Sequence, residues 1–466
     1  MNPITIPNIT IPVIGLPTIG IPSVGFPSAS GGGLVWPAGL KESIKAIYDP
    51  AKQGMTNYDV IEAYVEDFTY WTLDNTGITS TPKKIVIPAG TELKYVIAFR
   101  GFNSFTAGFD IKYTGNAVIT YRYNKEDGTV GTIAIDKSGI YHLPASVRAQ
   151  KNFGFYCNPQ TVTEEATIEQ LPTSILKDLS GNGNHAYLYG GKGKLNSGMG
   201  LYKVDFTSWR KSSVQTEVKP DVVKVTPNTS DYLFIQYANS VEIPSYKIKV
   251  IGLGDNVLKY QYATENGRKE INIVEGENEL PTSIKVSNDY QIGYRLTPGT
   301  SVFTITQIPD YPDQLCYDGK MYAVCYGFPI LTDYTVMAER TWFEKEEYSA
   351  FISNSLGGME DPSNGAFSVE LKSLNRFTTI SFGSITSIGI PEKGITYQTK
   401  QSYNGNSINV GTKESNDILI LGGRYFYKNN NTAGNTWTGC HGTIIVADRS
   451  FTEDEITWLK DNWKKI

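Results

Sequence analysis

Short runs of alternating apolar and polar residues fill most of the chain between residues 80 and 310. Each run is bounded by Gly, Asn or Asp, which are the residues typical of turns. Successive side chains of a strand point to opposite faces of a sheet, so strict alternation predicts strands with one buried face. The pattern therefore predicts an all-β fold of short strands joined by turns, as in β-sandwiches.

The alternating runs occur twice, at an offset of 137 to 139 residues. The corresponding segments are 109–112 with 246–249, 121–123 with 260–262, 143–144 with 280–281, 153–155 with 292–294, and 167–172 with 304–309. Chance rarely keeps an offset constant over such a distance. We predict two homologous β-sandwiches, residues 80–172 and 215–309, which serve as spacers or protein contacts.

Residues 57–68 follow a different period. Their apolar positions recur at the spacing of one helical face, and Asn57 is a suitable N-cap. The residues of this face are Val60, Ile61, Tyr64, Val65 and Phe68. We predict a short helix here, packed on the first sandwich, within a helical or irregular connector that covers residues 34–79.

The N-terminal segment 1–33 is apolar and rich in proline. After Pro3 and Pro7, prolines recur at a regular interval, at Pro12, Pro17, Pro22 and Pro27, and the first charged residue is Lys41. Proline at this frequency excludes a helix and a central strand, so the segment is predicted to be extended. The run Ser28–Gly33 then predicts a flexible hinge between this arm and the rest of the chain.

Three common explanations do not fit this arm. It lacks the positive region and the uninterrupted apolar core of a signal peptide. An extended backbone with unpaired amides cannot insert into a membrane, and disordered linkers are polar or charged. We therefore expect the arm to be buried against other copies of this protein, as a trimer, or in a groove of a larger assembly. The predicted anchor residues are Ile6, Ile9, Ile11, Ile14, Leu16, Ile19, Ile21, Val24 and Phe26.

The segment Asp178-Leu-Ser-Gly-Asn-Gly-Asn184 is a tight turn ahead of an apolar run. It resembles the motif that opens laminin-G-like (concanavalin A-like) jelly-roll domains. Residues 334–338 resemble a strand of that family, and residues 442–456 resemble its closing strand and short helix. A capping box of Thr452 and Glu455, with Phe451 as a hydrophobic staple, supports that helix. The resemblance implies a jelly roll over residues 173–213 and 311–466, interrupted by the second sandwich.

Candidate catalytic and metal-binding residues are few. Glucanases related to this family carry paired carboxylates on one strand, whereas Glu339 stands alone on its strand and residues 344–347 predict a solvated turn. We therefore expect no enzymatic activity. Asp178 either caps its own turn or helps to bind calcium, and the first role is favoured. Trp437 packs in a core, is exposed at the surface without a ligand, or stacks on a glycan.

The histidines and cysteines predict neither a metal site nor a cofactor. None of the three histidines has a second His or Cys at ligand spacing. The four cysteines (Cys157, Cys316, Cys325 and Cys440) are too few for a secreted disulfide scaffold. Cys316 and Cys325 could approach each other across a short hairpin, but buried free thiols are the favoured interpretation.

Charge and architecture together narrow the function. A net charge of −5 and a pI near 5.5 give no cationic footprint for nucleic acid. An apolar anchor, a hinge, duplicated sandwiches and a lectin-like domain predict a structural protein on the surface of a phage virion. It would be a head fibre, tail fibre or decoration protein that is anchored by its arm to a capsid or tail protein and attaches to a host-surface glycan. The alternative is a bacterial cell-surface or secreted glycan-binding protein.

Overall fold

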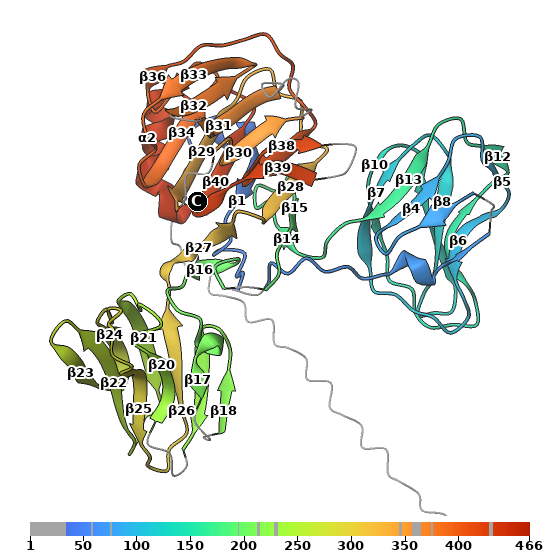
Figure 1. Cartoon of the computed structure of the whole chain (residues 1–466). Helices are drawn as coiled ribbons and strands as arrows, with labels where there is room; N and C mark the ends of the chain where they lie inside the picture. The colour runs from blue at the N-terminus through green and yellow to red at the C-terminus, as the bar shows by residue number, and fades with distance from the viewer. Residues whose placement is uncertain are drawn as a thin grey trace, which may run out of the picture.

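A computed structural model of the chain describes residues 34–466, apart from 57–58, 75–76, 194, 212–214, 228–231, 344–346, 357–364, 374–375 and 428–431. Its strands pair antiparallel in sandwiched sheets, which confirms the predicted all-β fold class (Figure 1). The arm and its anchor residues lie outside the described part of the chain, and their contacts stay a prediction. Within the described residues, no helix combines the length and apolar character that crossing a membrane requires.

Two eight-stranded sheets form the largest part of the molecule. The first, which we call the β29 sheet, contains in order β16 (Met199–Leu201), β27 (Asp310–Asp318), β40 (Thr438–Ala447), β29 (Thr335–Trp342), β34 (Gly394–Thr399), β35 (Ser402–Tyr403) and β36 (Asn406–Ser407), with β1 (Ile44–Tyr48) paired to β40. The second, the β31 sheet, contains β14 (Ile175–Leu176), β15 (Ala186–Tyr189), β28 (Tyr322–Tyr326), β37 (Ile418–Leu421), β30 (Ile352–Ser355), β31 (Gly365–Ser373), β32 (Arg376–Ser381) and β33 (Ser384–Ile388).

An apolar core that includes Phe351, Phe367 and Trp437 lies between these two sheets. Helix α2 (Glu453–Asn462) packs on the outer face of the β29 sheet, where Leu459 joins a second apolar cluster. Its capping box of Thr452 and Glu455 is present as predicted. Because both faces of β40 are covered, nine of its ten residues are buried, which explains why this strand does not alternate.

Each of the two repeats forms a pair of five-stranded sheets. One sheet of the first sandwich contains, in order, β10 (Gly139–Leu143), β7 (Phe109–Thr114), β13 (Ala166–Gln170), β4 (Lys84–Ile87) and β3 (Thr79–Ser80). Its other sheet contains β2 (Thr72–Leu73), β6 (Val96–Arg100), β11 (Phe153–Cys157), β8 (Ile119–Asn124) and β9 (Val130–Ile135). One sheet of the second sandwich contains, in order, β17 (Arg210–Lys211), β20 (Tyr232–Tyr237), β25 (Gln291–Thr297), β22 (Val257–Thr264) and β23 (Gly267–Ile273). Its other sheet contains β18 (Gln215–Val218), β19 (Val222–Thr226), β26 (Phe303–Ile308), β21 (Tyr246–Ile251) and β24 (Gly276–Leu280).

In both sandwiches, an equivalent buried glutamine binds the backbone of the segment that enters the sandwich. The Gln170 side chain accepts hydrogen bonds from the backbone of residues 65 and 66, and Gln307 accepts them from residues 203 and 204. A 3-10 turn capped by Asp67 or Asp205 opens each copy. The repeat therefore includes Asp67-Phe-Thr-Tyr-Trp71 and Asp205-Phe-Thr-Ser-Trp209, which lie before the starts expected from the sequence.

The β29 sheet, the β31 sheet and α2 form the domain that we call the jelly roll. The chain leaves this domain twice to build the two sandwiches (Figure 1). Strand β1 of the jelly roll precedes the first sandwich, and β14, β15 and β16 come between the two. The expectation of a helical or irregular connector over residues 34–79 is therefore wrong for β1, and the helix expected over 57–68 is absent from its described residues, 59–68. Val60 is buried in the jelly-roll core and Phe68 in the first sandwich. The chain passes between two cores here, so its apolar residues are not gathered on one face.

Candidate functional site

The Asp178–Asn184 turn fastens β1 to the jelly roll. The Asp178 carboxylate accepts hydrogen bonds from the backbone amides of Ile47 (3.0 Å), Ser180 (2.8 Å) and Asn184 (3.0 Å), and from the Ser180 hydroxyl (2.9 Å). The side-chain amide of Asn184 donates to the Lys45 carbonyl at 2.7 Å. Gly181 and Gly183 have φ values of 91° and 77°, a left-handed conformation that favours glycine.

These hydrogen bonds give the Asp178–Asn184 turn a structural role. Four donors satisfy the Asp178 carboxylate, so the capping role is the one that the geometry supports. Among the described residues, no group of three or more His, Cys, Asp or Glu side chains is placed to hold a metal ion. The turn explains how the first strand after the arm is held in a sheet whose other strands come much later in the chain.

A buried ion pair connects the two sheets of the jelly roll. Glu370 on β31 is fully buried and has a φ of 56° beside a β-bulge. Its Oε2 accepts from the Arg340 Nε at 2.7 Å, and its Oε1 accepts from the Arg340 Nη2 at 2.7 Å. Trp342 donates to Oε2 at 2.8 Å, and the Tyr403 hydroxyl donates to Oε1 at 2.9 Å. We call these four residues the Glu370 brace.

The surroundings fix the charge of the brace. Burial alone would lower the pKa of Arg340, but the Glu370 carboxylate raises it above its ordinary value, so the guanidinium stays charged. Burial and the Glu370 charge raise the pKa of the Tyr403 hydroxyl well above its usual range. Tyr403 therefore keeps its proton near neutral pH and acts as a hydrogen-bond donor.

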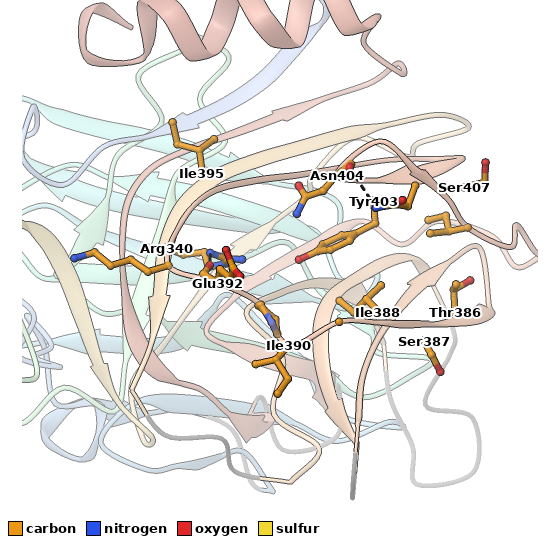
Figure 2. Close-up of a pocket in the computed structure, with 15 residues that line it drawn as sticks. Arg340, Thr386, Ser387, Ile388, Ile390, Glu392, Ile395, Tyr403, Asn404 and Ser407 are labelled. Carbon is orange, nitrogen blue, oxygen red and sulfur yellow. Dashed lines mark hydrogen bonds between the residues drawn. The ribbon is translucent and has the colours of Figure 1, made fainter.

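A slot of about 460 Å³ opens beside the brace, between the edge strands of the two sheets. One wall is β33 with the loop 389–393, and the other is β34 with the β35–β36 hairpin. Figure 2 shows the Tyr403 ring extending from its hairpin toward Arg340, with Ile388 and Ile390 on the β33 wall. The side chains of Ser387, Asn404, Asn406 and Ser407 provide hydrogen-bonding groups at the rim.

This combination suits a polyhydroxylated ring. Ile388, Ile390 and the Tyr403 ring provide apolar surface, while amides and hydroxyls around them can bond sugar hydroxyls in either direction. The Arg340 guanidinium donates to Glu370 and to the carbonyls of Glu392 and Gly394, so it shapes the loop 389–393 that forms one wall. The sequence did not indicate this site, because its residues lie on segments that meet only in the folded sheets.

Other residues singled out from the sequence lie elsewhere. Trp437 is fully buried between the sheets, 5.0 Å from the Phe351 ring, so core packing is the correct alternative for it. Glu339 is not isolated in space, because it lines a hollow of about 420 Å³ with Asp49. Its carboxylate accepts from the Gln314 amide at 3.1 Å. Asp49 directly follows β1, whereas Glu339 lies on β29, so no local motif could reveal this grouping.

The cysteines are buried free thiols, as predicted. Cys316 on β27 lies directly opposite Cys440 on β40 in the β29 sheet. Cys325 belongs to β28 in the β31 sheet. The disfavoured alternative, in which Cys316 and Cys325 face each other across a hairpin, does not occur, because the two residues lie in different sheets.

Comparison with known proteins finds similarity in solved structures alone. No known protein family matches the sequence, and no curated protein matches it. The similar solved structures include several of the Trypanosoma rangeli sialidase. The complex with sialic acid has 10% identity and a TM-score of 0.24 over 84% of this chain and 86% of that chain. The complex with 2,3-difluoro-KDN has 9% identity and a TM-score of 0.26 over 83% of each chain. The covalent intermediate with 2,3-difluorosialic acid has 10% identity and a TM-score of 0.24 over 90% of this chain and 91% of that chain.

The expectation that the chain is not an enzyme is contradicted by this comparison, because these similar structures are enzymes. We therefore withdraw it. A TM-score near a quarter at 10% identity does not transfer an activity to this chain either.

Proposed function

We propose that this chain is an attachment protein on the surface of a virion and that it binds a host-surface saccharide in the slot beside the Glu370 brace. The observation that carries the proposal is the slot itself. It combines apolar surface with a rim of amides and hydroxyls, and two sheets joined by a buried ion pair hold its walls. Rigid support of this kind lowers the entropic cost of binding.

The position of β1 supports the anchoring part of the proposal. The apolar arm leads through residues 34–43 into β1, which pairs with β40 and is fastened by the Asp178 turn. An arm held by capsid or tail proteins, or by its own copies as a trimer, would thus be joined to the central strands of the jelly roll. The two sandwiches extend from that jelly roll as lateral bodies.

An array of bacterial surface polysaccharides, probed with the labelled full-length chain, tests the saccharide part. We expect a restricted set of glycans to bind, and Ser387→Trp and Asn406→Trp to abolish that binding because both exposed rim positions would fill the slot with an indole. The matched control is Asn239→Trp, an exposed turn position of the second sandwich. Binding that survives both slot substitutions would refute this assignment of the site.

A further inference from the structure

The two sandwiches differ on one equivalent sheet face. In the second sandwich, Lys247 lies opposite Glu279, and Lys249 lies opposite Glu277, on exposed positions of β21 and β24. Opposite charges in direct register form a solvated ladder. In the first sandwich, the same positions of β7 and β10 pair Asp110 with His142, and Lys112 with Ile140. The duplication has thus preserved the register and changed the chemistry of the face.

The changed face packs against the jelly roll. The Tyr187 hydroxyl of β15 donates to the Asp110 Oδ2 at 2.8 Å. Ile140 packs against an apolar cluster that contains Leu171 of the inter-domain segment together with Tyr187, Ile418 and Phe426 of the jelly roll. The second sandwich keeps its charged ladder because the equivalent face is exposed.

This contact leaves a pocket of about 350 Å³ with walls from both bodies. The first sandwich contributes Lys112, Thr114, Ser138 and Ile140, and the jelly roll contributes Tyr326, Asp417, Ile418 and Phe426. The rings of Tyr326 and Phe426 are 5.7 Å apart at 80°, so they form an apolar corner. The Tyr326 hydroxyl is paired with that of Tyr189 at 2.9 Å, which holds its ring in place.

The charged groups of the pocket have opposite signs. The Lys112 Nζ lies 4.8 Å from the Tyr326 ring centroid and 5.7 Å from that of Phe426, so the ring faces keep the ammonium inside the pocket. Asp417 on the other wall is exposed and offers a carboxylate. One donor and one acceptor of this kind can bind two hydroxyls of the same ring, and their charges cancel.

We propose that this interdomain pocket is a second saccharide site, separate from the slot, and that it takes a neutral mono- or disaccharide. The half-buried side chains of Tyr326 and Ile140 give the pocket an apolar wall for the C–H face of a sugar ring, and Lys112 and Asp417 bond its hydroxyls. An acidic sugar fits less well, because the Asp417 carboxylate lies in the wall and the charge of Lys112 already interacts with Glu169, its cross-strand neighbour. Since its walls belong to two bodies, a bound sugar stabilises the contact between them.

Isothermal titration and saturation-transfer NMR of the full-length chain test this site, with lactose, maltose and cellobiose as neutral probes. We expect at least one of the three to bind. Thr114→Arg, at an exposed wall position, should abolish binding by filling the pocket, and Asp417→Asn should weaken it about tenfold through loss of a charge-assisted hydrogen bond. The matched control is Ile251→Arg, the equivalent exposed position of the second sandwich, which should bind like the unchanged chain.

Three results would overturn the proposal. The first is that none of the neutral disaccharides binds, and the second is that binding persists in Thr114→Arg. The third is that cellobiouronic acid binds as tightly as cellobiose, which would contradict a preference for neutral sugars. Neutral-sugar binding that is lost only in the slot variants Ser387→Trp and Asn406→Trp would assign the sugar to the slot, so failure of this site is distinguishable from failure of the proposed function.

Discussion

Replacement of Glu370 by Gln tests the buried brace most directly. The substitution keeps the shape of the side chain but removes its charge, so Arg340, whose side chain is 2% exposed, is left without its counter-ion. The Gln amide nitrogen cannot accept a hydrogen bond. Either Trp342 or Tyr403 therefore loses its acceptor as well.

The size of the effect follows from burial. Removing one partner of a buried pair costs about 3–5 kcal/mol, because the remaining charge stays buried and unpaired. A domain with the size of the jelly roll loses about 2–4 °C of melting temperature per kcal/mol, so Glu370→Gln should lower the melting temperature by roughly 10 °C. Arg340→Met combined with Glu370→Gln removes both charges and should restore much of that loss.

Differential scanning calorimetry, with tryptophan fluorescence to report Trp342 and Trp437, measures this effect in the jelly roll. The matched control is Glu270→Gln, which removes an exposed pair with Lys259 in the second sandwich and should leave the melting temperature unchanged within error. The reasoning is wrong if the Glu370→Gln variant has the same melting temperature as the unchanged chain. It is also wrong if the double substitution is as unstable as the single one, since the loss would then not come from an uncompensated charge.

Three further predictions concern titration and anchoring. Burial raises the pKa of the Cys325 thiol to about 12, so at pH 8 it should react with a thiol reagent only after denaturation, as followed by mass spectrometry. Burial lowers the pKa of His441 to about 4 from an ordinary 6.5, so the unfolded chain binds a proton at a higher pH than the folded chain does. The free energy of unfolding should therefore be unaffected by this group above pH 6.5 and fall by about 3 kcal/mol as the pH approaches 4. Denaturant midpoints measured across this pH range should show the fall, and His441→Gln should reduce it. Ile11→Asp with Ile21→Asp should release the chain from particles, at about 1.5–3 kcal/mol of lost transfer energy per residue and a further cost for a buried carboxylate, whereas Ser28→Asp in the hinge should leave the copy number in purified particles unchanged.

Local patterns in the sequence were sufficient for the elements that local physics decides. The alternation over 109–112 and 246–249 predicted two strands of the repeated sandwiches, because side chains of a strand point alternately to either face. The capping box of Thr452 and Glu455 predicted the start of α2, because those two residues satisfy each other's backbone amides. In each case the residues that decide the element are within a few positions of one another.

Tertiary structure decided everything that depends on distant segments. The apolar spacing over 57–68 is compatible with a helix, but Val60 and Phe68 are buried in two different cores, so the chain does not form that helix. Glu370 and Arg340 lie on facing sheets, and β1, near the start of the described chain, pairs with β40, near its end. The energies of such contacts depend on which strands become neighbours and on how far water is excluded between them. Neither quantity is encoded in the spacing of residues along the chain, so the brace, the slot and the interdomain pocket exist only in the folded molecule.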